Sequence, residues 1–200
     1  MITIALAGAG VLASCSTNDT PAGTSPSSST STQATSSANA ADVQFAQMMI
    51  VHHQGAIEMA SLAADRANRQ EVKDLAHRIE QAQQPEIDTM TAWLDSWGEP
   101  TLDDNGAMPG MDHGDMSMGG EGGMASGEDM QRLTDAAGAQ FDELFLQLMI
   151  VHHQGAVTMA QAEVDGGTNP DAVSLAKKVI SDQSAEIAEM KSLLAIYAGN

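Results

Sequence analysis

The alternation of apolar and polar positions predicts four long helices between residue 41 and the end of the chain. Apolar side chains there recur at intervals of three and four residues, which is the period of an amphipathic α-helix. The expected helices span 41–67, 70–97, a start between 126 and 139 to an end at 166–167, and 170 to about 197. Short links within each successive pair would give two antiparallel hairpins, so the pattern predicts an all-α four-helix bundle.

Residue types at the expected helix ends support these boundaries. Asn39 is a suitable N-cap, and Asp42 follows where a carboxylate interacts favourably with the N-terminus of a helix. Asn169 and Pro170 form the equivalent N-cap and first-turn pair of the fourth helix. Gly98 is expected to end the second helix.

Two places predict departures from straight helices. Pro85 lies inside the second helix and lacks the N–H that the helical ladder uses, so a local kink is expected there. In the third helix, Ser126 and Asp129 resemble a capping box, whereas Gly138 favours a break in an early turn. The third helix is therefore expected to start at one of these two places.

One octapeptide, MIVHHQGA, occurs twice, at 49–56 and at 149–156. The match continues without gaps on both sides at an offset of one hundred residues, which indicates an internal duplication. Coinciding pairs include Asp42 with Asp142, Phe45 with Phe145, Met59 with Met159, Glu86 with Glu186 and Met90 with Met190. The helical domain, 41–199, is thus expected to consist of repeat one (41–98), a Met-rich loop (99–127) and repeat two (128–199).

The duplicated pattern of Asp, Phe, Met, His-His, Gln, Gly-Ala and Met-Ala, followed by Gln-x-x-Glu-Ile-x-x-Met, resembles a known bacterial family. This is the secreted family called domain of unknown function 305, and the resemblance covers about residues 40–199. It implies a ferritin-like four-helix bundle built from two repeated helical hairpins. It also implies copper binding in the periplasm, to which some members are linked, and no established catalytic activity.

The first forty residues differ in composition from the rest and are expected to lie outside the helical domain. Residues 1–14 are small and apolar, and together with Cys15 they resemble a lipoprotein signal whose cysteine becomes lipidated. Residues 15–40 are rich in Ser, Thr, Ala and Pro, which predicts a flexible tether. A buried cytosolic cysteine is the alternative. The chain is therefore expected to be extracytoplasmic and lipid-anchored to the cell membrane, at the cell surface or in the periplasm.

Charge and cysteine content narrow the classes of partner. The chain has 27 Asp and Glu against 8 Lys and Arg, with a formal net charge of −19. This acidic balance argues against nucleic acid as a partner and favours metal cations. Cys15 is the only cysteine, which excludes an intrachain disulfide and a cysteine-based zinc site.

Each copy of the octapeptide places two adjacent histidines beside methionines on one helix face. At 100° per residue, Met48, His52 and Met59 share one stripe, and Met49 and His53 form the neighbouring stripe. The second copy repeats this arrangement, and the following helix of each pair carries a carboxylate and a methionine on its inward face. These further candidate ligands are His152, His153, Met149, Met159, Glu86, Met90, Glu186 and Met190.

Imidazole and thioether side chains together favour copper, and methionine favours Cu(I), with Cu(II) as an alternative state. A metal bound by these histidines should weaken as pH falls through about 6.5, because imidazole binds metal only when deprotonated. In the competing interpretation, the methionines fill the core and the histidines bond to Glu86 or Glu186. Gly55 and Gly155 on the same face would allow two helices to approach closely in either case.

The connection between the repeats gives a second signal for soft metals. It is rich in Gly and Asp and otherwise polar, so its methionines have nowhere to be buried. Its candidate ligands for Cu(I) or Ag(I) are Met108, Met111, His113, Met116 and Met118, and Met124 follows them. A Met-rich hydrophobic interaction patch is the alternative.

Together these patterns predict an extracytoplasmic copper-binding lipoprotein for copper or silver buffering, tolerance or delivery. Its expected partners are metal ions, the membrane through its lipid anchor, and other copper-handling envelope proteins. One rival is a metal-dependent oxidase of the ferritin-like class, although neither repeat has the Glu-x-x-His motif of di-iron centres. The other rival is a non-metal envelope module whose His-His face docks a partner.

Overall fold

The computed structural model describes residues 37–102 and 121–198, and the protein is all-α there, as the sequence predicts. A single turn of 3-10 helix and one isolated bridge between Ala67 and Gly138 are the other regular features of these residues. The elements in chain order are α1 (Ala40–Ser61), α2 (Ala63–Arg66), α3 (Gln70–Trp97), η1 (Glu121–Gly123), α4 (Gly127–Asp135), α5 (Ala139–Gly166) and α6 (Pro170–Ala198).

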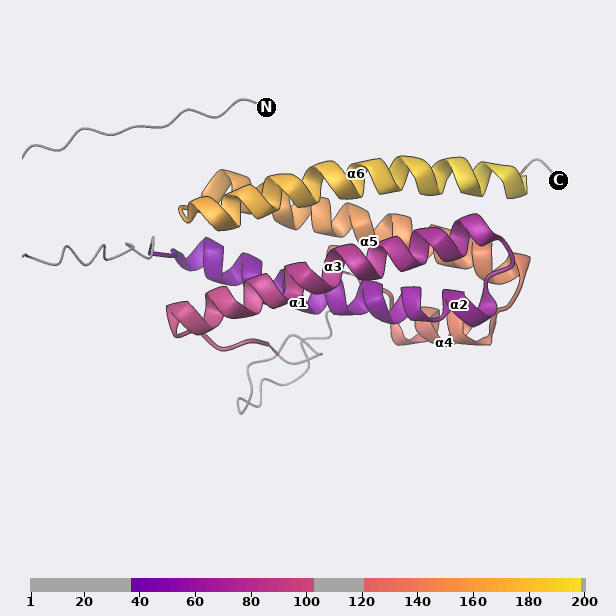
Figure 1. Cartoon of the computed structure of the whole chain (residues 1–200), viewed down its shortest axis with the longest axis horizontal. Helices are drawn as coiled ribbons and strands as arrows, with labels where there is room; N and C mark the ends of the chain where they lie inside the picture. Colours follow the sequence, from indigo (N-terminus) through magenta and orange to yellow (C-terminus); the bar gives the residue numbers. More distant parts are fainter. Residues whose placement is uncertain (1–36, 103–120, 199–200) are drawn as a thin grey trace, which may run out of the picture. The chain divides into compact units, whose positions relative to one another are not determined.

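The long helices lie side by side in two hairpins. α1 packs along α3 and α5 packs along α6, and the two hairpins meet mainly through α1 and α5 (Figure 1). Two ion pairs also join α3 to α6, between Arg78 and Glu189 and between Glu86 and Lys178. The arrangement places the middle of α1, which carries the first His-His pair, against the middle of α5, which carries the second.

The helix starts follow the predicted caps. Asn39 accepts hydrogen bonds from the N–H groups of Ala41 and Asp42, and its own N–H donates to the Asp42 carboxylate, which completes a capping box. Ser126 and Asp129 form the second capping box, at the start of α4. These side chains satisfy N–H groups that a helix leaves without internal partners.

The predicted third helix is two helices. α4 ends at Asp135, and Gly138 then adopts a φ of 64°, in the left-handed region that favours glycine, before α5 begins. The prediction of a single helix with one of these two starts was therefore wrong, because a helix begins at each place. The first helix is also divided, because α1 ends at Ser61 and its last turn continues as the short α2. The second helix, α3, runs through Pro85 without interruption.

Two repeat-related aspartates lock the hairpins together. Asp42, at the start of α1, accepts hydrogen bonds from the N–H groups of Thr168 and Asn169 in the turn between α5 and α6. Asp142, at the start of α5, accepts from the N–H groups of Asn68 and Arg69 in the turn before α3. Each repeat thus caps the interhelical turn of the other, and both aspartates are fully buried.

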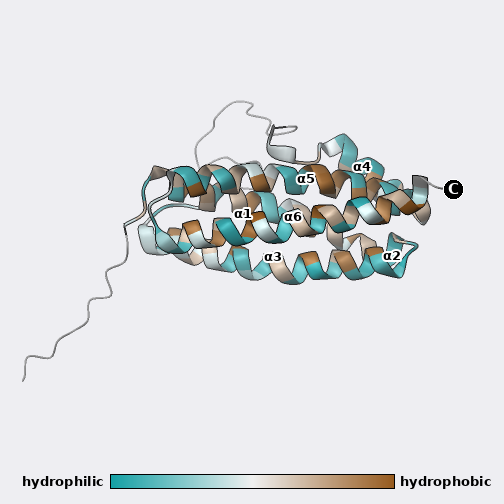
Figure 2. Ribbon diagram, turned by 90° about the horizontal axis from the view of Figure 1, so that it is seen from above, coloured by the Kyte–Doolittle hydropathy of each residue, from teal (hydrophilic) through white to brown (hydrophobic). Residues whose placement is uncertain are grey.

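The buried positions of the long helices are mostly apolar and the exposed ones mostly polar. Hydrophilic and hydrophobic residues alternate along each of these helices (Figure 2). The core has two clusters, one centred on Phe45, Ile87 and Leu94 and the other on Leu75, Ile79 and Phe145. Among the described helices, none combines the length and apolar character needed to cross a membrane.

Candidate metal centre

The two histidine pairs of the repeat meet at the contact between α1 and α5. The rings of His52 and His152 lie against each other, with centroids 3.7 Å apart and planes inclined by 40°. Both side chains are almost completely buried, as are those of His53 and His153. The sequence left open whether the pairs face a shared centre or form two separate sites, and this contact brings one histidine of each pair together.

Burial favours the neutral form of the two stacked rings. It lowers the pKa of His52 to about 3, helped by the nearby histidines and opposed by the Gly122 carbonyl. It also lowers the pKa of His152 well below its ordinary value, which a weak interaction with the His52 main chain opposes. With pKa values lowered in this way, protons compete with a metal for these two rings only at a pH below the expected 6.5. Because the unfolded chain takes up protons that the folded chain refuses, these groups reduce folding stability progressively as pH falls below 6.5.

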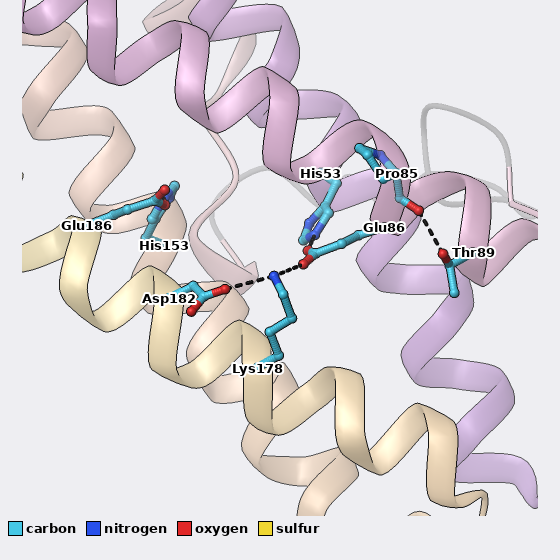
Figure 3. Close-up of polar contacts among 8 residues, drawn as sticks. All are labelled: His53, Pro85, Glu86, Thr89, His153, Lys178, Asp182 and Glu186. Carbon is cyan, nitrogen blue, oxygen red and sulfur yellow. Dashed lines mark hydrogen bonds and ion pairs between the residues drawn. The ribbon is translucent and has the colours of Figure 1, made fainter. Parts of the chain in front are cut away.

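The second histidine of each pair is held by a carboxylate. His53 Nε2 lies 2.8 Å from a Glu86 oxygen, and His153 Nε2 lies 2.7 Å from a Glu186 oxygen. Lys178 of α6 donates to the other Glu86 oxygen. The Glu86 carboxylate of α3 is thus held by side chains from two other helices, α1 and α6 (Figure 3). Burial would raise the pKa of Glu86, but the hydrogen bonds from His53 and Lys178 outweigh it and lower the pKa.

This pairing fixes which ring nitrogen is available for a ligand. A carboxylate can only accept, so Nε2 of His53 and of His153 carries the proton in each pair. In the neutral ring Nδ1 then keeps its lone pair, and the Nδ1 atoms of both residues are buried without a hydrogen-bond partner. A histidine that donates one N–H to a carboxylate and offers its other nitrogen is the arrangement that metal sites commonly use.

A short segment, Gly122 to Met124, covers the histidine centre. Its Gly122 carbonyl accepts a hydrogen bond of 3.0 Å from His52 Nε2, and η1 packs directly on α5. A Cβ atom on Gly155 would lie only 1.6 Å from the Gly122 oxygen, so no side chain fits there. A Cβ atom on Gly55 would lie 3.2 Å from the Met124 methyl carbon. Gly155 therefore accommodates this segment, whereas Gly55 faces both Met124 and His152 of the neighbouring α5.

The predicted methionine ligands do not lie together in the structure. Five of them have no exposed surface and pack in the two core clusters, as the competing interpretation of the sequence proposed for them. These residues are Met49, Met59, Met90, Met149 and Met190. The predicted ligands Met108, Met111, His113, Met116 and Met118 lie outside the described residues, as does the predicted lipidation site Cys15.

Met48 and Met159 meet in a separate pocket near the start of α1. The pocket has a volume of about 190 Å³ and is also lined by Glu163, whose side chain is buried. Both Glu163 oxygens lack a hydrogen-bond partner at normal distance. Burial, with the facing Asp42 carboxylate, raises the pKa of Glu163 to about 8, so this group is largely protonated at neutral pH.

Sequence reasoning missed several residues around the centre. Met124 was grouped with the connecting loop, whereas its thioether lies beside the histidines. Gly122 and Lys178 carried no sequence signal, because their contacts bridge 70 and 92 residues. The offset between the repeats could have drawn attention to Lys178, because its counterpart Arg78 also forms an ion pair across the hairpins.

The described carboxylates and imidazoles of this protein do not form a complete metal site by themselves. Within residues 37–102 and 121–198, no three His, Cys, Asp or Glu side chains are grouped closely enough to hold an ion. The histidine centre instead combines neutral imidazoles with a nearby thioether, a set that suits soft ions such as Cu(I) better than hard divalent ions.

Comparison with known proteins identifies the family of the chain. The sequence profile of a family described as domain of unknown function (DUF305) matches residues 42–194. The chain belongs to the DUF305 family. Solved structures of DUF305 proteins from Streptomyces coelicolor and Deinococcus radiodurans share 37% and 32% identity with it, at TM-scores of 0.67 and 0.68. The matches cover 78% and 80% of this chain and 91% and 98% of those chains.

A third DUF305-like structure is that of CopM in its Cu(II)-bound form. It has 33% identity and a TM-score of 0.65, and the match covers 78% of this chain and 97% of CopM. CopM is also known in Cu(I)-bound and Ag-bound forms that resemble this chain. The names of these similar structures describe metal-bound and DUF305 proteins and no enzyme. Among functionally curated proteins, none matches the chain.

Proposed function

We propose that this DUF305 protein binds copper outside the cytoplasm and serves copper or silver buffering, tolerance or delivery. The four long helices form a ferritin-like bundle of two repeated hairpins, which the reciprocal Asp42 and Asp142 contacts support. A lipid on Cys15 anchors the chain to the membrane, and residues 15–40 hold the bundle away from it. Metal ions and other copper-handling envelope proteins are its partners.

One observation carries the metal assignment: the buried histidine centre has lone pairs without hydrogen-bond partners. Nδ1 of all four histidines and Nε2 of His152 lack partners among the described residues. Burying a polar atom without a partner costs free energy, and a metal ion bound beside one of these rings would satisfy its free nitrogen. The stacked contact of His52 with His152 supports one shared ion rather than two separate sites.

Glu86 and Glu186 act in this proposal as partners of the histidines and not as direct ligands. Each carboxylate orients one imidazole and raises its basicity through the Nε2 hydrogen bond. Their charges also offset the charge of an ion held by neutral rings. The core methionines pack the bundle, and the methionines of the connecting loop supply accessory sites for Cu(I) or Ag(I).

The similar structures support copper rather than another metal. CopM, which shares about a third of its residues with this chain, has been seen with Cu(I), Cu(II) and silver. Thioether and imidazole ligands together have the same preference. The binding role is favoured over the oxidase role because neither repeat supplies the Glu-x-x-His motif of di-iron centres.

The test measures Cu(I) affinity in a full-length variant that lacks the five predicted loop ligands. The residues changed to Ser are Met108, Met111, His113, Met116 and Met118. In that background, His52→Leu with His152→Leu should remove the tight Cu(I) component in competition with a chromophoric chelator. Glu86→Gln should weaken it by roughly 10–100-fold, as loss of an outer hydrogen-bond partner does. His77→Leu is the control, because His77 is exposed and far from the centre along α3. Unchanged Cu(I) affinity after replacement of all four central histidines would show that they are structural.

A further inference from the structure

The end of the connecting loop is fitted to the histidine centre by contacts on both helices. On α1, His52 Nε2 donates to the Gly122 carbonyl. On α5, the main chain of Gly123 passes so close to Gly155 that a Cβ on Gly123 would lie 3.3 Å from the Gly155 Cα atom. Gly122 and Gly123 both have positive φ, at 79° and 83°, which residues with side chains rarely adopt. These contacts and backbone angles therefore fix the conformation of Gly122 and Gly123.

The residue that follows these two glycines brings a sulfur atom to the histidines. The position of a Cβ atom on Gly55 lies 3.7 Å from Met124 Sδ and 3.4 Å from His152 Nε2. A thioether and an imidazole nitrogen thus converge above the Cα atom of one glycine. His152 is only 1% exposed, and neither of its ring nitrogens has a hydrogen-bond partner.

We propose that Met124 Sδ and His152 Nε2 together bind a soft monovalent cation, Cu(I) or Ag(I), in the space above Gly55. This inference rests on the proposed copper function and adds a ligand from outside the repeated helices. His52 is a positioning residue in this site, because its N–H holds the Gly122 carbonyl and thereby places Met124. The glycines of both repeats are required for the site, Gly55 to leave room for the ion and Gly155 to admit the segment.

The chemistry of the pair selects the ion. Thioether sulfur is a soft, neutral ligand, and Cu(I) and Ag(I) accept few ligands of this kind. A hard divalent ion would need several oxygen ligands, and the described residues provide no cluster of them here. Met124 also continues the sequence of loop methionines toward the centre, so an ion captured by the loop could pass to His152 through Met124 by exchange of one thioether for another.

Methionine replacement tests the ligand directly. In the full-length protein with its five loop ligands changed to Ser, Met124→Leu should lower Cu(I) affinity by at least about tenfold, since loss of even an outer partner costs 10–100-fold. X-ray absorption should show loss of the sulfur contribution around Cu(I). Met130→Leu, a similar change six residues later on α4, should leave both measurements unchanged.

Glycine replacement tests the docking of the segment without removing a ligand. Gly155→Ala must displace the Gly122 main chain, because the added Cβ would overlap its oxygen. The variant should retain its helix content by circular dichroism yet lose the sulfur contribution and at least about tenfold in affinity, as Met124→Leu does. Gly127→Ala is the matched control, because a Cβ there meets nothing within 4 Å.

The outcomes separate this inference from the proposed function. If the loop-substituted protein binds Cu(I) through its histidines and Met124→Leu changes neither affinity nor sulfur contribution, Met124 is not a ligand, while the copper function stands. If Gly155→Ala keeps the sulfur contribution, the docked segment does not create the site. If the wild-type protein binds neither Cu(I) nor Ag(I), the proposed function fails and this site fails with it.

Discussion

Glu163 shows how one side chain can oppose the stability of its own fold. It is 2% exposed, and its carboxyl group interacts with the ionised Asp42 carboxylate that faces it. Burial would raise the pKa of Asp42 too, but hydrogen bonds from the main chain of Asn39 and Asn169 and from side chains lower it instead. The proton of this pair therefore stays on Glu163, whose pKa rises to about 8.

The first prediction concerns the pH dependence of stability at Glu163. Between its ordinary pKa of 4.5 and its folded pKa of about 8, the folded chain keeps a proton that the unfolded chain releases. Stability from this group is thus present below pH 4.5 and is lost as pH rises to 8. Glu163→Gln stays neutral, so its melting temperature should exceed that of the wild type by several degrees at pH 8 and converge with it near pH 4.5.

Thermal melts of both proteins at several pH values check this expectation. Glu58→Gln, at an exposed position of α1, is the control and should follow the wild-type curve. A constant difference between Glu163→Gln and the wild type across this pH range would mean that the Glu163 proton is not linked to folding.

Between secondary-structure elements, the duplicated aspartates do more than cap their own helices. Asp42 accepts from two N–H groups at the start of α6, and Asp142 accepts from two near the start of α3. Tyr197, in the last turn of α6, also donates to Asp142, which raises the pKa of the tyrosine together with its burial. The main-chain donors Thr168, Asn169, Asn68 and Arg69 each belong to the hairpin opposite their aspartate, so these bonds form only when both hairpins are docked. Tyr197 belongs to the same hairpin as Asp142.

The second prediction is that Asp42 and Asp142 each contribute strongly to the free energy of unfolding. Asp42→Ala leaves three main-chain N–H groups without this acceptor and Asp142→Ala leaves two, at a cost of roughly 2–4 kcal/mol in the free energy of unfolding. Urea unfolding followed by circular dichroism measures this loss. Asp88→Ala, on the exposed face of α3, should change stability by no more than about 0.5 kcal/mol. Equal small losses in all three variants would contradict the proposed lock between the hairpins.

At the scale of the whole molecule, the bundle and the loop are expected to bind metal independently. The third prediction changes Met108, Met111, His113, Met116 and Met118 to Ser. Cu(I) stoichiometry should fall because soft ligands are lost, whereas the melting temperature should stay within about 2 °C because connecting loops generally contribute little to a core.

Equilibrium dialysis and thermal melts of this variant provide the measurements. Asp112→Asn with Asp115→Asn, in the same segment, is the control for a general effect of the substitutions. Unchanged stoichiometry would rule out the loop as an accessory site. The substitutions should not extend to Met124, because that residue contacts the histidine centre.

The fourth prediction concerns attachment to the membrane. Cys15→Ser should move the protein from the membrane fraction to the soluble extracytoplasmic fraction, because a single lipidated cysteine is the proposed anchor. Thr20→Ser, in the same polar stretch, should leave the distribution unchanged. Retention of Cys15→Ser in the membrane fraction after a high-salt wash would refute the lipoprotein assignment.

The sequence by itself determined the helices, their caps and the duplicated histidine pairs. These features depend on interactions within four residues along the chain, such as the bond from Asn39 to the Asp42 N–H, so residue types and spacing suffice to predict them. Gly138 is an example, because its freedom to adopt positive φ marked the break between α4 and α5.

Only the tertiary structure decided which of the chemically similar side chains lie at the centre. Helical periodicity predicts which side of a helix is buried, but it does not specify what covers that side, so it could not distinguish core Met59 from Met124. Asp42 likewise looked like a local cap, although its partners also include main-chain groups 126 and 127 residues away. Such contacts depend on the packing and register of whole helices, because these bring together atoms that the sequence keeps apart.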